Sequence, residues 1–316
     1  MQFNKPLFWD SKKISFWSIL LFPFSIIYLI IVWIIKIPSI FRKYKYPCSI
    51  ICVGNIYLGG TGKTSFAIEL KKILEEKKLK VCFVKKYYSD QLDEQKLLDN
   101  FGKTFVDESR LKALKKARDE NYEIAIFDDG LQDKSIEYDL SFVCFNKKNM
   151  CGNGRMLPSG PLRENLSNLK MYQNVIFIGN EDKSLFQNIL LKDYKNLNFY
   201  DASYQITNLN DFDLNDTFTI FSGIGNHDTF REMLIINKFN IIHDLEFADH
   251  YNYLKKDMDN IFDLAKANKS KILTTEKDYI RLDENYKKNI GFIKISLKIK
   301  QIEELKNKLN FRYENF

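Results

Sequence analysis

The chain contains 316 residues, enough for two lobes that each bury a hydrophobic core. A hydrophobic fraction of 45% excludes an intrinsically disordered protein. Five cysteines, an odd number without a Cys-X-X-Cys pair, argue against a zinc site or a disulfide scaffold and indicate buried thiols in a reducing compartment. The net charge of +7 favours anionic partners such as phosphates, acidic lipid headgroups or nucleic acid, although a genome composition that favours Lys, Ile and Asn would produce the same excess.

Residues 14–35 form an uncharged, strongly apolar segment, ISFWSILLFPFSIIYLIIVWII. As a helix it would be roughly 33 Å long, enough to cross the hydrocarbon layer of a bilayer. Basic residues flank the segment and no small-residue cleavage site follows it, so we expect residues 1–46 to be a retained membrane helix with a basic linker. Pro23 and the serines weaken a spanning helix, and the tryptophans suit an interface, so spanning the membrane and lying in one leaflet are both open.

The glycine-rich sequence VGNIYLGGTGKT at residues 53–64 follows an apolar strand and precedes a helix that begins at Thr64. Its glycines let the backbone turn N–H groups toward a phosphate. Lys63 would reach the β- and γ-phosphates, and the Thr64 hydroxyl would hold Mg²⁺. The strict phosphate-loop motif requires a glycine where Tyr57 stands. The predicted nucleotide-binding residues are Gly54, Asn55, Gly59, Gly60, Thr61, Gly62, Lys63 and Thr64.

A second nucleotide motif is predicted where the apolar strand at residues 124–127 runs into Asp128-Asp129-Gly130. A carboxylate at the end of a buried strand beside the phosphate loop can coordinate Mg²⁺ directly or through water. Taken alone, an Asp-Asp-Gly sequence is more typical of a turn. Its position after a phosphate loop, in an alternating pattern of strands and helices, favours the metal site at Asp128 and Asp129.

The rest of the chain alternates between strand and helix patterns, which predicts parallel α/β lobes. We expect strands at residues 49–53, 79–84, 104–106, 124–127, 140–145, 174–178, 199–206, 217–221, 239–245, 271–275 and 291–297. We expect further helices at residues 91–100, 108–121, 228–237, 255–268 and 301–310. The predicted fold is a P-loop NTPase-like parallel-sheet lobe at residues 47–205 and a smaller α/β lobe at residues 206–316, behind the N-terminal hydrophobic membrane helix.

Two further segments carry polar side chains suited to a ligand. The loop CGNGRMLPSGPLREN at residues 151–165 contains Arg155 and Arg163, which are natural phosphate clamps, although the segment could be only a long connection. His250 lies between a strand and a helix, where it could face a cleft, although a single loop histidine is usually a surface residue. The sequence TTEKD at residues 274–278 could be no more than a capped helix start.

Together these segments resemble the tetraacyldisaccharide 4'-kinase family, the lipid A 4'-kinases of Gram-negative bacteria. The matching motifs, in family order and over most of the chain, are VGNIYLGGTGKT, DDGLQ at 128–132, GNGRMLPSGPLRE at 152–164, SGIGN at 222–226, FADHY at 247–251 and TTEKD at 274–278. The resemblance implies a P-loop kinase that uses ATP and Mg²⁺ and phosphorylates the 4'-hydroxyl of tetraacyldisaccharide 1-phosphate, a membrane lipid. It places the protein at the inner membrane with its catalytic lobes on the cytoplasmic side. We expect no nucleic-acid partner, and the oligomeric state is open.

The resemblance also implies roles for individual residues. Lys63 and Thr64 fall on the catalytic, phosphate-binding lysine and the Mg²⁺-binding threonine, and Asp128 and Asp129 fall on the acidic pair near the metal. His250 falls on a histidine that works with an aspartate to activate the acceptor hydroxyl.

The aspartate of that pair belongs to a Gly-Asp-Glu-Pro segment in the family, and its counterpart here is Leu-Asp-Glu-Gln at residues 92–95. Asp93 would be the base and Glu94 a metal or nucleotide contact. Because the flanking Gly and Pro are missing, Asp90 is the alternative to Asp93.

Other departures from the family pattern are Asp133, where the family has His, and His227, where it has Pro; they could mean an altered lipid substrate or a degenerate enzyme. The main rival prediction is a membrane-associated P-loop ATPase or GTPase switch with a protein partner. Partitioning ATPases carry a lysine where Leu58 stands, and GTPases carry Asn/Thr-Lys-X-Asp, so both details favour the kinase.

Overall fold

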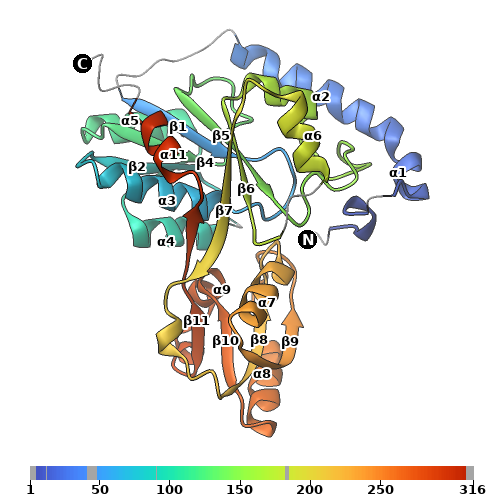
Figure 1. Ribbon diagram of the computed structural model, residues 1–316, viewed down its shortest axis with the longest axis vertical. Coiled ribbons are helices and arrows are strands. Elements are labelled where there is room, and N and C mark those ends of the chain that lie inside the picture. The colour runs from blue at the N-terminus through green and yellow to red at the C-terminus, as the bar shows by residue number, and fades with distance from the viewer. Residues whose placement is uncertain (1–4, 12, 41–47, 90, 182–184, 311–316) are drawn as a thin grey trace. The chain divides into compact units, whose positions relative to one another are not determined.

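The computed structural model describes residues 5–11, 13–40, 48–89, 91–181 and 185–310. Contacts within the chain define two compact units, and most of their helices and strands are labelled in Figure 1. The larger unit contains Lys5–Tyr87, Phe101–Ser203 and the segment that begins at Leu297, and the smaller unit contains Tyr88–Asn100 and Tyr204–Ser296. The predicted division near residue 205 follows chain order, whereas in the structure the chain leaves the larger unit at residue 88, returns at 101, leaves again at 204 and returns at 297.

An eight-stranded sheet forms the centre of the larger unit within the described residues, in the order β12-β7-β6-β5-β1-β4-β2-β3 (Figure 1). From β7 to β3 in this order, neighbouring strands run parallel, which confirms the predicted α/β class. The strands are β1 Ser49–Gly54, β2 Val81–Lys86, β3 Thr104–Asp107, β4 Ile124–Asp128, β5 Leu140–Asn146, β6 Asn174–Ile178, β7 Asn198–Ile206 and β12 Ile295–Ile299.

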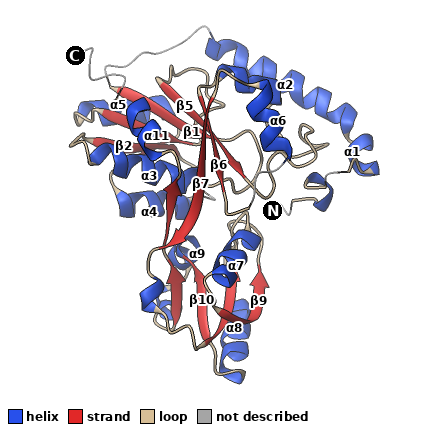
Figure 2. Ribbon diagram, viewed as in Figure 1, coloured by secondary structure: helices blue, strands red, loops and turns tan. Residues whose placement is uncertain are grey.

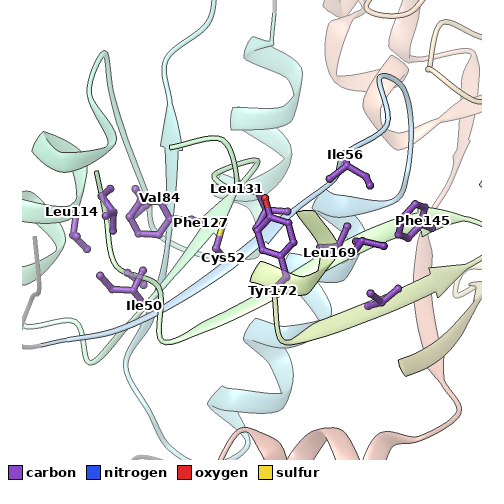
Figure 3. Packing of buried hydrophobic residues seen from close by; sticks show 14 of the residues in the cluster. Ile50, Cys52, Ile56, Val84, Leu114, Phe127, Leu131, Phe145, Leu169 and Tyr172 are labelled. Atoms are coloured by element: carbon purple, nitrogen blue, oxygen red, sulfur yellow. The ribbon is translucent and has the colours of Figure 1, made fainter. Parts of the chain in front are cut away.

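The central strands of this sheet are mostly apolar because helices cover both of its faces (Figure 2). Ile50 and Cys52 of β1 belong to the core cluster that includes Leu114 of α5, and Figure 3 shows these side chains together. Phe66 of α3 packs edge-to-face on Phe142 of β5, with ring centroids 5.2 Å apart. The helical segments of this unit, beside the two at the N-terminus, are η1 Leu7–Trp9, α3 Lys63–Glu75, α5 Arg110–Asp119, η2 Leu166–Met171, α6 Leu185–Asp193 and α11 Ile302–Lys308.

The apolar N-terminal segment forms two helices, α1 Phe16–Leu20 and α2 Phe22–Ile40, rather than the single helix predicted. Pro23 lies in the first turn of α2, where its missing N–H needs no partner, so a new helix begins there. Ser18 and Ser25 are buried and donate hydrogen bonds to backbone carbonyls of the glycine-rich loop that follows β5. The large apolar side chains of both helices are exposed instead. Among the described residues, no helix satisfies both the length and the apolarity that crossing a membrane requires.

The smaller unit, within the described residues, is built on a parallel four-stranded sheet in the order β11-β10-β8-β9. Its strands are β8 Thr217–Ser222, β9 Asn240–Glu246, β10 Lys271–Thr275 and β11 Ile290–Ile293. The single strand predicted at residues 291–297 is two strands, because the chain leaves this sheet after β11 and pairs in the larger sheet as β12. The helical segments are α4 Leu92–Phe101, η3 Leu209–Asp211, α7 His227–Ile236, α8 Lys255–Ala267, α9 Glu276–Arg281 and α10 Glu284–Lys287.

Candidate active site

The glycine-rich loop between β1 and α3 has the geometry of a phosphate-binding loop. Gly62 has a φ of 82°, a conformation that favours glycine, and α3 begins directly after it at Lys63. The side chain of Asn55 spans the loop: its Nδ2 donates to the carbonyl of Tyr57 at 2.6 Å and to Thr61 Oγ1 at 3.0 Å. At Gly54 a Cβ atom would lie 2.6 Å from Leu131 Cγ, so a larger residue would clash there. The loop is therefore held from within, with the N-terminus of α3 open to an anion.

Tyr57 stands where the strict motif has glycine, and its side chain packs in a small hydrophobic cluster separate from the main core. Its buried ring contacts Cys151, Met156 and Leu162 in the loop after β5. Its hydroxyl donates to Asp10, and Lys5 Nζ lies 2.8 Å from it. The departure from glycine thus ties the phosphate loop to the loop at residues 151–165.

The predicted acidic residue Asp128 lies beside Thr64. Because β4 pairs with β1 in parallel register, Val53 is opposite Asp128, and the Thr64 hydroxyl donates to Asp128 Oδ2 at 3.2 Å. Lys85 at the end of β2 also contacts Asp128 Oδ2, at 2.9 Å, and both side chains are fully buried. Asp128 Oδ1 is buried and has no hydrogen-bond partner among the described residues. A hydroxyl and a carboxylate with a free oxygen form the donor set that Mg²⁺ prefers, so these residues fit the ion.

Asp129 is surrounded by positive charge. Arg163 Nη1 lies 3.2 Å from both carboxylate oxygens, and Lys63 Nζ lies 3.8 Å from Oδ2. Burial opposes ionisation of Asp129, but the charges of Lys63, Arg163 and Lys85 outweigh it and lower its pKa to about 2. Asp129 is therefore ionised at neutral pH. It holds Lys63 and Arg163 close together, and these cations would also contact the phosphates of a bound nucleotide.

The two arginines predicted as phosphate clamps have different surroundings. Arg163 lies in the group just described, whereas the guanidinium of Arg155 lies over the ring of Phe22 in α2, 5.3 Å from its centroid. Among the described residues, no ion pair joins Arg155 to the acidic pair. Lys85 was not predicted as a site residue.

A second group of polar residues lies in the smaller unit and contains the predicted Asp93 and His250. His250 Nδ1 is 3.0 Å from Asp93 Oδ1, and Asp93 is 5% exposed. His250 has a φ of 56° in the turn after β9, and its Nε2 faces Asp249 Oδ1 at 3.8 Å. The alternative base, Asp90, lies outside the described residues.

The ionisation of this pair is set by its neighbours. Burial opposes the charge on Asp93, but the hydrogen bond to His250 and the charges of Arg281 and Lys277 lower its pKa to about 2. Burial also opposes the charge on His250, but the hydrogen bond to Asp93 and the charge of Asp249 raise its pKa. Glu94, predicted as a metal or nucleotide contact, forms an ion pair with Lys277 at 2.8 Å.

A third polar group surrounds His227, which stands where the family has proline. Its Nδ1 lies 2.6 Å from Ser222 Oγ and its Nε2 lies 2.6 Å from Asp244 Oδ1. Although a serine, a histidine and an aspartate in a row can form a nucleophilic site, Ser222 is fully buried and cannot meet a substrate. The group therefore joins the end of β8, the start of α7 and β9.

A parallel α/β sheet with a glycine loop before a Lys-Thr helix start, and a carboxylate on the neighbouring strand, defines a P-loop nucleotide-binding protein. The sequence matches the family described as tetraacyldisaccharide-1-P 4'-kinase over residues 17–313. The chain belongs to this family, which confirms the family and the kinase class predicted from the motifs.

Individual relatives agree with this membership. The tetraacyldisaccharide 4'-kinase of Pelagibacter ubique is 50% identical over 310 residues, which cover 98% of each chain. That of Rickettsia akari is 30% identical over 320 residues and covers 96% of each chain. Among solved structures, an "apo" form of LpxK from Aquifex aeolicus in complex with ATP shares the fold, with a TM-score of 0.69, 24% identity and coverage of 93% of this chain and 98% of that chain.

Proposed function

We propose that this protein transfers the γ-phosphoryl group of ATP to the 4'-hydroxyl of a tetraacyldisaccharide 1-phosphate, a lipid A precursor. The observation that carries this proposal is the hydrogen-bonded pair of Asp93 and His250. A sugar hydroxyl is a poor nucleophile and needs a group that accepts its proton, whereas a nucleotide switch needs none. The names of the relatives support the same reaction.

In this proposal the backbone N–H groups of the loop at residues 59–64 and the Lys63 ammonium bind the β- and γ-phosphates of ATP. Thr64, Asp128 and Asp129 would hold Mg²⁺. When bound, the ion would neutralise charge that develops on the phosphates. Arg163 adds positive charge beside Asp129, and Arg155 contacts a phosphate of the lipid substrate.

The acceptor oxygen attacks the γ-phosphorus, a new oxygen–phosphorus bond forms, and the bond to the β–γ bridging oxygen breaks to release ADP. The hydroxyl proton passes to the Asp93–His250 pair. Because the pKa of Asp93 is about 2, the carboxylate cannot keep the proton at neutral pH. The proton is therefore accepted by the neutral imidazole of His250, and the Asp93 carboxylate, which raises the pKa of His250, stabilises the imidazolium that forms.

The protein acts at the inner membrane, with its catalytic units on the cytoplasmic side where ATP is present. The support for this location is the exposed apolar surface of α1 and α2, which includes Trp17, Phe24 and Ile31. Helices that expose apolar side chains on one face and bind the rest of the protein through polar side chains on another are suited to lie in a lipid interface.

The experiment measures transfer of labelled γ-phosphate from ATP to purified tetraacyldisaccharide 1-phosphate in detergent with Mg²⁺. The wild-type protein should form a labelled bis-phosphorylated lipid, Lys63→Ala should not, and Asp93→Ala should form it only slowly. Asp93→Ala should lower kcat far more than ATP affinity, because its carboxylate acts on the acceptor. Hydrolysis of ATP or GTP stimulated by membranes, without a lipid product, would instead support the nucleotide switch.

A further inference from the structure

Helix α9 directs two cations at two consecutive carboxylates of α4. Lys277 and Arg281 are four residues apart and so lie on one face of α9. Lys277 Nζ is 2.8 Å from Glu94 Oε1, and Arg281 Nη2 is 3.0 Å from Asp93 Oδ2. The TTEKD motif is therefore more than a capped helix start, because the helix that it begins carries both cations.

Arg281 is held tightly enough to position another side chain. Its side chain is 8% exposed, and Nη1 donates to the carbonyl of Gly223 at 2.8 Å and to Asp278 Oδ1 at 3.1 Å. Asp278 is fully buried and is itself held by the Gly223 N–H at 3.0 Å and the Tyr253 hydroxyl at 2.7 Å. The guanidinium is thus held at Nη1, and Nη2 presents an N–H to Asp93.

The two oxygens of Asp93 have different partners. Oδ2 accepts from Arg281, and Oδ1 contacts His250 Nδ1 at 3.0 Å. The hydrogen bond at Oδ2 restricts rotation of the carboxylate, so it favours the direction of Oδ1 toward the imidazole of His250. The other charged groups that act on Asp93 or His250 are Lys277, Glu94 and Asp249.

We propose that Arg281 is a positioning residue for phosphoryl transfer, which holds Asp93 so that the Asp93–His250 pair is aimed at the acceptor hydroxyl. This inference rests on the proposed function. Arg281 touches neither substrate nor the transferred proton; it acts through Asp93. Its loss should therefore affect catalysis only while the Asp93 carboxylate is present.

The test compares Arg281→Ala, Asp93→Ala and the double variant in the lipid phosphorylation assay, with kcat and the KM for ATP determined separately. Misplacement of a reacting group by about 1 Å costs about 10²-fold in rate. We expect Arg281→Ala to lower kcat by about that factor with less than about a threefold change in the KM for ATP, and to have little further effect in the Asp93→Ala background. Millimolar guanidinium chloride should partly restore the rate of the Arg281→Ala variant and leave the low rate of Asp93→Ala unchanged.

A matched control is Arg231→Ala, an arginine of the same unit that is half-exposed and pairs with Asp244; it should keep wild-type kcat. Should Arg281→Ala fail to fold, as judged by thermal unfolding, Arg281→Lys is the substitute. It keeps the positive charge but lacks the planar guanidinium, and it should show a smaller loss of kcat than the loss expected for Arg281→Ala. An equal loss with and without the Asp93 carboxylate, or a loss of kcat matched by a rise in the KM for ATP, would overturn the inference. A wild-type protein without lipid product would instead refute the proposed function.

Discussion

His250 Nδ1 lies 3.0 Å from Asp93 Oδ1, a hydrogen bond between residues 157 positions apart in the sequence. The bond links the turn after β9 to the first turn of α4, and both belong to the smaller unit. Asp93 is ionised over the physiological range, with a pKa of about 2, and its hydrogen bond to His250 raises the pKa of the imidazole. This relationship makes the stability of the protein depend on pH.

The folded protein binds a proton on His250 more tightly than the unfolded chain, because the pKa of His250 is raised by folding. The resulting stabilisation is fully present below the unfolded pKa of about 6.5 and is lost as pH rises through the folded pKa. We expect the difference in unfolding free energy between wild type and His250→Gln to be largest near pH 6 and to shrink in alkaline buffer. Urea unfolding at a series of pH values measures it, and a difference that stays constant over the series would contradict the prediction.

Replacing Lys85 by methionine should destabilise the larger unit. Asp128 would remain buried without this cation, and removing one partner of a buried pair typically costs about 3–5 kcal/mol. Chemical denaturation without nucleotide measures the loss. The double variant Lys85→Met/Asp128→Asn removes the unpaired charge, so it should be more stable than Lys85→Met alone. Equal stability of the two variants would show that the buried charge is not the cause.

Restoring the family's proline at His227 should lower stability without lowering activity. The change removes the imidazole that lies between Ser222 and Asp244, and a buried polar group left without a partner costs about 1–3 kcal/mol. His227 is the first residue of α7, where the ring of proline is tolerated, so backbone strain adds little. His227→Ala is the companion variant and should show a similar loss in thermal unfolding. An unchanged or raised Tm in both would mean that the hydrogen-bonded group does not stabilise the fold.

Charges placed on the exposed face of α2 should weaken binding to lipid. Ile30 and Ile34 are 52% and 54% exposed, so Ile30→Asp/Ile34→Asp should leave the fold intact but oppose insertion into an apolar interface. Cosedimentation with phospholipid vesicles should fall at least about tenfold, while ATP affinity is unchanged. Ile236→Asp, at a 62% exposed residue of α7, is the control and should bind vesicles like wild type. Equal vesicle binding by all three proteins would refute the location proposed for α1 and α2.

Local sequence patterns determined much of this protein. Strands β6 and β10 have the predicted bounds, and α3 begins within one residue of the predicted start, because apolar runs and glycine loops act over a few neighbouring residues. Six short motifs in order were sufficient to predict the family. The hydrogen bond between Asp93 and His250 was expected only through that resemblance, since no local pattern joins residues so far apart.

Only the tertiary structure decided which groups meet. The assignment of residues 88–100 to the smaller unit and the division of the predicted strand at 291–297 between two sheets depend on packing against distant elements. The same holds for Lys85 beside Asp128 and Arg281 beside Asp93. From the local sequence alone, a lysine or arginine in a strand or helix is expected to be exposed to solvent. It becomes the buried partner of a carboxylate only when the fold brings the two groups together.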